Sequence, residues 1–510
     1  MLEIDGHSLT LEDVERVARG LETDVALTPA AREAIDASRR VVERALDAGE
    51  PVYGVTTGFG RLAELIIPPD RRLEMQVNLV RSHACGFGPP ASRELSRAML
   101  LLRANSLARG NSGIRREVVE LLLAFLREGL DPMIPEYGSV AASGDLAPLA
   151  HMTLCLLGEG YVHGAEGPES AMQALERAGL KRVTLREKEG LALINGTQAT
   201  TGLGVMALLR AEAAAETAEL AGAMSLEGLK GTPTPFAEEV HATRPHPGQI
   251  TSAARLRSLL ADSEIRESHR YGDPRIQDAY SLRCMPQVHG AARDVMGFVR
   301  RVLEIEINSA TDNPLVFVDS GAILSAGNFH AQLIAEALDF LTIVCTDLAA
   351  ISERRIERLL NPDLSNLPAF LSRDPGVESG LMTTQAAVVD VLSEMRVLSH
   401  PASVDSVTTS ANKEDHVSMG MAAARKAWRA VECLEYVLAV ELLCAAQALE
   451  FLKPLTPGVG VRKGYDLARQ QVAPLDGDRV LSGDIERLRG LVDARAFRDV
   501  VLECAAGSRT

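Results

Sequence analysis

The chain lacks the features that would mark a membrane or secreted protein. It contains no uninterrupted apolar run of membrane-spanning length. Residues 1–6 carry acids where a signal peptide needs basic and then apolar residues. The seven cysteines are odd in number and include no CxxC pair, so they do not suggest a disulfide framework. We therefore expect a soluble cytoplasmic protein with reduced thiols and no membrane partner.

Positive charge and metal-binding motifs are also scarce. The 53 Lys and Arg residues are outnumbered by 69 Asp and Glu residues, giving a formal net charge of −16, which argues against a nucleic-acid partner. Eleven histidines are present, yet none begins a His-Glu-x-x-His sequence. Because that helical motif is typical of a catalytic zinc site, we expect no metal cofactor.

The sequence does contain long stretches without helix breakers. Neither Gly nor Pro occurs in residues 329–361 or 421–453, and each stretch spans 33 residues, enough for a helix of roughly 50 Å. Helices of that length must bundle to bury their apolar faces. Residues 51–60 and 131–148, rich in Gly, Pro and Ser, indicate loops, and the apolar stretch 191–194 is typical of a strand.

A chain of 510 residues is too long for one compact core and should divide into at least two packed regions. We predict a mainly α protein, in which a long-helix bundle adjoins a mixed, loop-rich N-terminal region that carries the functional loops. Residues 1–200 are expected to form this N-terminal region, and residues 201–510 the bundle and the C-terminal helices. Apolar positions on several sides of the long helices favour oligomerisation.

Residues 138–151 contain a tripeptide, Ala142-Ser143-Gly144, that can form a prosthetic group. Cyclisation requires the amide nitrogen of Gly144 to attack the carbonyl carbon of Ala142, an approach that a Cβ would crowd. Loss of the Ala142 carbonyl oxygen as one water closes the ring, and loss of the Ser143 hydroxyl as a second water leaves an exocyclic methylidene. The product is 4-methylidene-imidazol-5-one (MIO), an electron sink that none of the twenty side chains provides.

An ordinary turn entering a helix, with Asp145 near the cap and Pro148 in the first turn, is the alternative interpretation of this run. The complete run, however, resembles the signature of the aromatic amino acid ammonia-lyases, and the resemblance extends over roughly residues 50 to 450. It implies that the MIO group forms autocatalytically, without a metal or diffusible cofactor. It also implies a homotetramer with active sites shared between subunits.

The resemblance assigns roles to residues in other motifs. Beyond the electrophile, elimination needs a base for the β-proton, a clamp for the carboxylate and a selector for the side chain. Tyr53, among the glycines of residues 53–60, is implied as a catalytic acid/base. Arg283, whose planar fork can hold both carboxylate oxygens, is the implied clamp, and Tyr280 would handle protons or orient the ring. The other assignments are catalytic Asn195 and substrate-binding Gln277, Asn313 and Phe329.

Structural roles are the alternatives for several of these residues. Tyr53 could be a buried loop tyrosine whose hydroxyl is satisfied, and Arg283 could belong to an ion pair. Asn313, which precedes a proline, could cap a loop. Phe329 could equally be a core residue.

Two residues bear on the amino acid that is used. His83, which follows Ser82, and Glu414 resemble the residues of histidine-specific members. A carboxylate and an imidazole can hydrogen-bond both ring nitrogens of a substrate imidazole, whereas a phenyl ring would leave buried polar groups unpaired at about 1–3 kcal/mol each. We therefore predict conversion of L-histidine to trans-urocanate and ammonia, with His83 binding substrate and Glu414 catalytic.

The chain departs from the family pattern at two positions near these residues. Lys413 replaces a usual Gln and could pair with Glu414, and Met395 stands where many relatives carry Asn. A tyrosine ammonia-lyase or an aryl aminomutase is the alternative within the family. Outside it, the alternatives are a fumarase-type lyase and a non-catalytic helical scaffold.

A Ser143→Ala variant should retain its helical fold but lose nearly all ammonia release, because no methylidene can form without the serine hydroxyl. Mass spectrometry of the intact, untreated wild-type protein should show a deficit of two water molecules relative to the encoded mass. The variant should lack this deficit while keeping the circular dichroism of the wild type. Full activity in the variant would contradict the assignment of the tripeptide.

Overall fold

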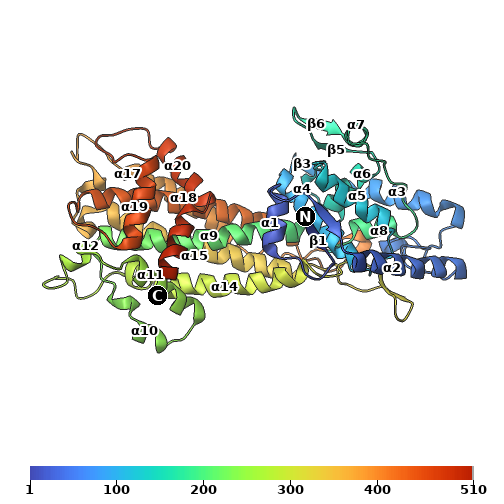
Figure 1. Cartoon of the computed structure of the whole chain (residues 1–510), viewed down its shortest axis with the longest axis horizontal. Coiled ribbons are helices and arrows are strands. Elements are labelled where there is room, and N and C mark those ends of the chain that lie inside the picture. Colours follow the sequence, from blue (N-terminus) through green and yellow to red (C-terminus); the bar gives the residue numbers. More distant parts are fainter. Residues whose placement is uncertain (508–510) are drawn as a thin grey trace. The chain divides into compact units, whose positions relative to one another are not determined.

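The computed structural model describes residues 1–507 and confirms the predicted mainly α fold (Figure 1). These residues form 21 α-helices, and their strands make only two-stranded sheets. Two compact units are each assembled from separate stretches of sequence. The division of the chain into two regions at residue 200 stays a prediction. Unit 1 comprises Met1–Met206, Arg300–Asp339 and Pro401–Arg425, and unit 2 comprises Ala207–Val299, Phe340–His400 and the described residues from Lys426 onwards.

Unit 1 is organised around helix α4, whose residues from Ala98 to Ala108 are almost all buried. This helix packs against α1, α2, α5 and α6. It begins after Ser92, whose hydroxyl accepts a hydrogen bond from the Leu95 backbone N–H and so caps the helix. The helices confined to this unit are α1 (Leu11–Ala18), α2 (Pro29–Ala48), α3 (Arg72–His83), α4 (Arg93–Ala108), α5 (Arg116–Arg127), α6 (Leu146–Leu156), α7 (Ala171–Arg177) and α8 (Glu189–Ile194).

The strands of the described residues all belong to unit 1 and are three or four residues long. The first pair is parallel and the other three are antiparallel. The pairs are β1 (Leu2–Ile4) with β2 (Val25–Leu27), β3 (Phe87–Pro90) with β4 (Pro135–Tyr137), β5 (Tyr161–His163) with β6 (Pro168–Ser170), and β7 (Leu315–Phe317) with β8 (Ala322–Leu324).

The strand predicted at residues 191–194 is wrong, because these residues lie in helix α8. Lys188 precedes the helix with φ 76°, and the Glu189 carboxylate accepts hydrogen bonds from the backbone N–H groups of Arg186 and Arg115. All six residues of α8 are buried. The unbroken apolar run therefore reflects burial on every side, which period-based reasoning cannot distinguish from a buried strand.

Two of the long helices were predicted from the sequence and two were not. Helices α15 (Gln332–Leu360) and α18 (Gly420–Glu450) occupy the two stretches without breakers, which confirms that prediction. Helices α9 (Gln198–Gly228) and α14 (Met285–Glu306) contain glycines, and α14 also contains a proline in its first turn. Breakers at such positions are compatible with a helix when close packing or the first turn accommodates them.

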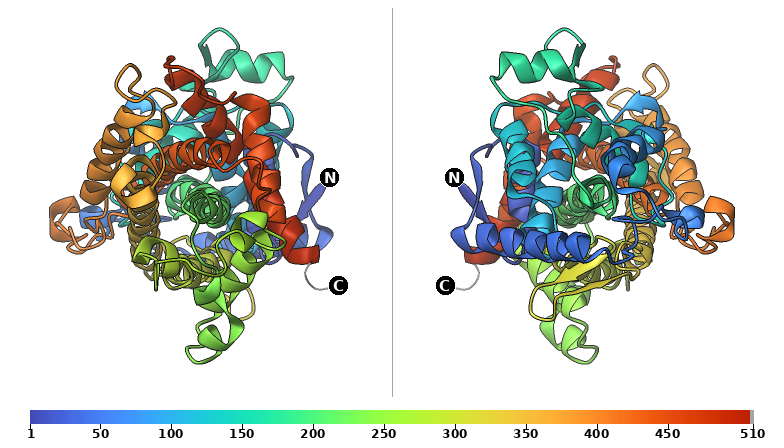
Figure 2. Two further views of the ribbon diagram at one scale, coloured as in Figure 1. Left: turned by 90° about the vertical axis from the view of Figure 1, so that its left-hand side faces the viewer. Right: turned by 90° about the vertical axis from the view of Figure 1, so that its right-hand side faces the viewer.

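Within unit 2, helix α9 is enclosed by other helices (Figure 2). A Cβ at Gly222 would lie 2.4 Å from the Met285 sulfur of α14, and one at Gly228 would lie 2.9 Å from the Ala448 Cβ of α18. The glycines of α9 therefore permit close helix packing. The helices confined to unit 2 are α10 (Glu238–Ala242), α11 (Pro247–Leu259), α12 (Glu264–Glu267), α13 (Tyr280–Arg283), α16 (Pro362–Ser365), α17 (Met382–Leu398), α19 (Val459–Gln471), α20 (Ser482–Asp493) and α21 (Ala496–Gly507).

None of the helices found in residues 1–507 combines the length and the apolar character needed to cross a bilayer.

Candidate active site

A cavity of about 630 Å³ in unit 1 brings together residues that lie far apart in the sequence. Its walls come from the loop of residues 53–67, helices α3 and α8, the segment that enters α6, and residues 410–414. Much of the lining is apolar, with leucine and isoleucine side chains from the loop and from α8. Of the predicted site residues, Tyr53, His83, Ser143, Asn195 and Glu414 line this cavity.

The backbone of the ring-forming tripeptide packs directly against the residue that follows Asn195. Gly144 forms a parallel β-bridge with Gly196, and the Asp145 N–H donates to the Gly196 carbonyl at 2.7 Å. Gly144 has φ 76°, and a Cβ placed on it would lie 2.3 Å from the Gly196 oxygen. Glycine is therefore required at position 144 by the available space as well as by its backbone conformation.

The preceding residues of this loop are held from the other side by the segment that enters α18. The Ser418 hydroxyl donates to the Ala141 carbonyl at 2.9 Å, and the Met419 N–H donates to the Val140 carbonyl at 3.0 Å. Ala141 has φ 53°, an unusual value for a residue with a Cβ. These bonds over-determine the loop conformation and leave the Ser143 side chain partly exposed at the cavity wall.

Asp145, which the sequence suggested only as a helix cap, has a different set of contacts in the structure. Its carboxylate makes no capping bond to α6. It accepts hydrogen bonds from the Ser139 hydroxyl at 2.8 Å and from the Thr200 backbone N–H and hydroxyl at 2.8 and 2.9 Å. Burial raises the pKa of Asp145, although these bonds act in the opposite direction. The carboxyl group thus joins the tripeptide loop to the start of α9.

Glu414 lies beside the residue whose hydroxyl must be lost. Ser143 Oγ donates a hydrogen bond to Glu414 Oε1, and Thr409 Oγ1 donates to Oε2 at 2.6 Å. Burial alone would raise the pKa of Glu414. The hydrogen bonds from Ser143, Thr409 and Ser410, together with the nearby His83, lower the pKa below its ordinary value. Glu414 is therefore an ionised proton acceptor at neutral pH.

Within residues 1–507, Lys413 forms no ion pair with Glu414, and the main causes of the Glu414 pKa shift are burial, the hydrogen bonds from Ser143, Thr409 and Ser410, and His83. The backbone of Glu414 instead pairs with that of Thr409: the Thr409 N–H donates to the Glu414 carbonyl at 2.8 Å. The departure at position 413 therefore leaves the Glu414 carboxylate directed to Ser143.

His83, at the end of α3, presents one ring nitrogen as an acceptor. Its Nδ1 lies 2.8 Å from the Leu79 carbonyl oxygen and 3.1 Å from the Ser82 hydroxyl. Because a carbonyl can only accept, Nδ1 carries the proton in the neutral ring, and Nε2 is left with its lone pair. The His83 ring lines the cavity. An acceptor nitrogen is thus available to a bound ligand.

Tyr53 lies on the loop that forms the outer wall. Its hydroxyl accepts a hydrogen bond from the Gly60 N–H at 3.1 Å, and its ring meets Phe59 edge to face with 6.5 Å between centroids. The hydroxyl therefore retains its proton for donation towards the cavity. The side chain is partly exposed and its hydroxyl has a hydrogen-bond partner, and the acid/base role of Tyr53 stays a prediction.

Asn195 ends α8 and carries an unpaired acceptor. Its backbone carbonyl accepts from Arg103 Nη1 at 2.9 Å. Within residues 1–507, the buried Asn195 Oδ1 has no hydrogen-bond partner. A buried amide oxygen without a partner is costly, and at a cavity wall it points to a ligand group that completes it.

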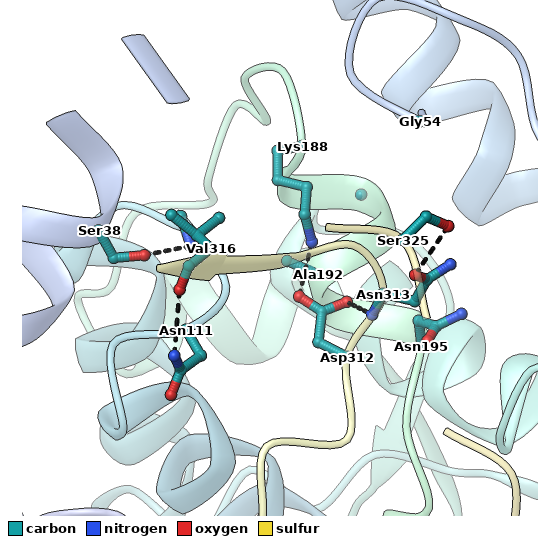
Figure 3. Close-up of polar contacts among 12 residues, drawn as sticks. Ser38, Gly54, Asn111, Lys188, Ala192, Asn195, Asp312, Asn313, Val316 and Ser325 are labelled. Carbon is teal, nitrogen blue, oxygen red and sulfur yellow. Dashed lines mark hydrogen bonds and ion pairs between the residues drawn. The ribbon is translucent and has the colours of Figure 1, made fainter. Parts of the chain in front are cut away.

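Asn313 and Phe329 do not line this cavity. The Asn313 side-chain oxygen accepts from the Ser325 hydroxyl at 3.1 Å and the Ala326 N–H at 2.8 Å (Figure 3). These are the contacts of a loop cap, the alternative named for Asn313. Phe329 is partly exposed. The substrate-binding roles of both residues stay predictions.

Gln277, Tyr280 and Arg283 belong to unit 2, where they line a separate cavity of about 550 Å³. The Arg283 guanidinium lies 4.5 Å from the centroid of the Tyr280 ring. Within the described chain, Arg283 forms no ion pair and its buried Nε has no hydrogen-bond partner. The alternative of a structural ion pair is therefore not observed, and the guanidinium is available to an anion.

Comparison with known proteins identifies the family. Residues 9–470 match the model of the aromatic amino acid lyases. The chain is 54% identical to the histidine ammonia-lyase of Anaeromyxobacter dehalogenans (strain 2CP-C), over 97% of this chain and 99% of the relative. The chain therefore belongs to the aromatic amino acid lyase family.

Solved structures of related enzymes share this fold. Histidine ammonia-lyase from Trypanosoma cruzi superposes with a TM-score of 0.91 at 42% identity, over 99% of this chain and 95% of that one. A tyrosine aminomutase from Streptomyces globisporus superposes with a TM-score of 0.93 at 39% identity, over 98% of both chains. The fold is thus common to relatives that act on different amino acids.

A Gly144→Ala variant should have a lower melting temperature and an intact mass without the deficit of two waters. The new Cβ would collide with the Gly196 carbonyl, and the added methyl would crowd attack by the amide nitrogen. Gly490→Ala is a matched control, because a Cβ at Gly490 has no neighbour within 4 Å. A complete mass deficit in Gly144→Ala would show that the space at this position does not limit cyclisation.

Proposed function

We propose that the protein eliminates ammonia from L-histidine to give trans-urocanate. The observation that carries this proposal is the convergence on one cavity of Ser143, Glu414 and His83, with Tyr53 opposite. The similarity to histidine ammonia-lyases over nearly the whole chain supports the same reaction. An electrophile precursor, a carboxylate and an imidazole are the groups that this chemistry needs.

The electrophile proposed for this site is an MIO group formed from Ala142, Ser143 and Gly144. Three observations support this group: Gly144 packs without a side chain against Gly196, Ser143 lines the cavity, and the nearby Asn195 oxygen is unpaired. When formed, the group supplies an electron sink that eases departure of the amine. Asn195 then has a hydrogen-bond partner in the ring or in the substrate amino group.

Glu414 and His83 support recognition of an imidazole. Once Ser143 has lost its hydroxyl, Glu414 Oε1 no longer receives that hydrogen bond and can accept from the substrate instead. His83 Nε2 provides the second acceptor. A substrate imidazolium can donate to both acceptors and a neutral imidazole to one of them, whereas a phenyl ring would leave both unpaired.

Tyr53 and Glu414 are the two groups positioned to move protons at this cavity. The Tyr53 hydroxyl, with Gly60 N–H bonded to its oxygen, can donate or accept at the substrate. Glu414 Oε2 still accepts from Thr409 after Ser143 has lost its hydroxyl, and the carboxylate accepts either the β-proton or an imidazole N–H. Asp145, with its raised pKa, holds the tripeptide loop against α9.

The predicted clamp residues line a separate cavity, so their role in the proposed site requires active sites that are shared between subunits. We propose a homotetramer with shared active sites, in which Gln277, Tyr280 and Arg283 bind the substrate and its carboxylate. The exposed Tyr280 ring and the unpaired Arg283 guanidinium support this role. Asn313 and Phe329 are proposed to shape the same site. A reducing cytoplasm is the proposed location, supported by the free thiols of all seven cysteines.

A tyrosine aminomutase or tyrosine ammonia-lyase is the second candidate. The tyrosine aminomutase of Streptomyces globisporus shares the fold at 39% identity. A tyrosine phenol could also donate to His83 Nε2, since that nitrogen is an acceptor. A phenol would leave the second acceptor, on Glu414, without a ring N–H, and this favours histidine.

With L-histidine, L-tyrosine and L-phenylalanine as substrates, kcat/KM should be highest for L-histidine. The measurement is the absorbance of the unsaturated acid together with release of ammonia. In a His83→Leu variant, kcat/KM for L-histidine should fall about 10- to 100-fold, because one hydrogen bond to the ring is lost at about 1–3 kcal/mol. Leu73→Ala, at an exposed position of the same helix, is the control. Equal or better turnover of tyrosine would overturn the substrate assignment, and a β-amino acid product would indicate a mutase.

A Thr409→Val variant should move the acidic limb of the kcat/KM profile to higher pH. Removing the Thr409 hydroxyl deletes one of the hydrogen bonds that lower the pKa of Glu414, so the carboxylate protonates at a less acid pH. Activity requires the ionised form and is lost as the pH falls through this pKa. An unchanged acidic limb, with unchanged melting temperature, would show that Glu414 is not the group that titrates.

A further inference from the structure

Helix α8, which ends at the unpaired Asn195 amide, begins at a completely buried lysine. Lys188 precedes the helix with φ 76°, a conformation that few residues with a Cβ adopt. Its Nζ lies 2.6 Å from Asp312 Oδ2, and neither side chain is exposed to solvent (Figure 3). The other oxygen of Asp312 accepts from the Asn313 N–H at 2.7 Å. The pair therefore joins the start of α8 to residues 311–313.

The opposite end of α8 is tied to the same segment. Arg103, buried in α4, donates from Nη1 to the Asn195 carbonyl and to Gln198 Oε1, both at 2.9 Å. Its Nη2 donates to the Ala192 carbonyl. Gln198 Nε2 in turn donates to Thr311 Oγ1 at 2.9 Å. A helix of only six residues is thus fixed at both ends against residues 311–312.

The Asp312 carboxylate attracts both of the buried cations that hold α8, Lys188 and Arg103. Burial lowers the pKa of Lys188, and the attraction of Asp312 opposes that effect. Burial likewise lowers the pKa of Arg103 to about 10, and Asp312 again opposes the effect. Two buried cations therefore depend on one carboxylate. Without it, Lys188 would either lose its proton or leave its place, and the start of α8 would move.

We propose that Lys188 and Asp312 are positioning residues that set the place of the Asn195 carboxamide in the cavity. The proposal rests on the function proposed above. Lys188 and Asp312 touch neither the cavity nor the tripeptide, so they act through the backbone of α8. A shift of about 1 Å at a group that contacts the reacting atoms can cost about 100-fold in rate.

The test compares two neutralised ion pairs. K188M/D312N removes both charges of the pair and leaves Arg103 without the attraction of Asp312. R97M/D131N is the matched control in the same unit. There Arg97 donates two 2.9 Å hydrogen bonds to the buried Asp131, and Arg93, 3.5 Å from the same carboxylate, likewise loses an attractive partner. Replacing both partners of a buried pair is often neutral for stability. We expect similar melting temperatures for the two variants and the full mass deficit in both. We expect kcat for L-histidine to fall about 10- to 100-fold in K188M/D312N alone, with KM changed less than about threefold.

Two further readouts separate positioning from general damage. Hydrogen exchange of the amides of α8 should accelerate in K188M/D312N and not in the control. In an Asn195→Ala background, K188M/D312N should cause no further loss of kcat, because its effect passes through the deleted carboxamide. Should K188M/D312N not fold, K188Q/D312N, which keeps a hydrogen bond between the side chains, replaces it.

The outcomes are distinct for the two proposals. Unchanged kcat in folded K188M/D312N, an additive loss in the Asn195→Ala background, or equal losses in the control would overturn the positioning role. A wild-type protein without the mass deficit, or without ammonia release from L-histidine, would instead overturn the proposed function.

Discussion

The contact between two glycine backbones, at Gly144 and Gly196, determines the geometry of the candidate site. Neither residue has a side chain, so the tripeptide loop can lie against the end of α8 with a hydrogen bond from Asp145 to Gly196. This contact places Ser143 at the cavity wall next to the segment that carries Asn195. Main-chain packing therefore determines the positions of the reactive groups, and the side chains act from these fixed positions.

Buried charge holds the segments that meet at this contact. Asp145 joins the loop to α9, and the Lys188–Asp312 pair joins α8 to residues 311–313. Such groups stabilise the fold little over apolar replacements, because desolvation offsets their attraction. Their contribution here is directional, since each hydrogen bond admits only a narrow range of distances and angles. Unit 1 thus uses charge to fix orientation, whereas the apolar residues of α4 supply its core.

The sequence predicted the mainly α fold, the helices now assigned as α15 and α18, and five residues that meet at one cavity. The fold and helix predictions rest on local patterns, whereas the five site residues follow from the resemblance of their motifs to the aromatic amino acid ammonia-lyases. The sequence pattern did not predict α8, because a short apolar run is compatible with both a buried helix and a buried strand. Nor could it pair Lys188 with Asp312, which lie 124 positions apart. Asp145 was identified in the sequence as a residue near a helix cap, but its hydrogen bonds to Ser139 and Thr200 depend on tertiary packing.

Neighbouring positions in the tripeptide differ in what they constrain. The Ser143 side chain lies at the cavity wall and donates one hydrogen bond to Glu414, so an inherited change in that codon can silence catalysis and still yield a well-folded polypeptide. Position 144 has no such freedom, because its surroundings admit no atom beyond the backbone. Natural alleles altered at 144 should therefore be eliminated by proteolysis before any defect in turnover is felt. A substitution at position 143 therefore affects formation of the prosthetic group alone, whereas a substitution at position 144 affects both its formation and the stability of the fold.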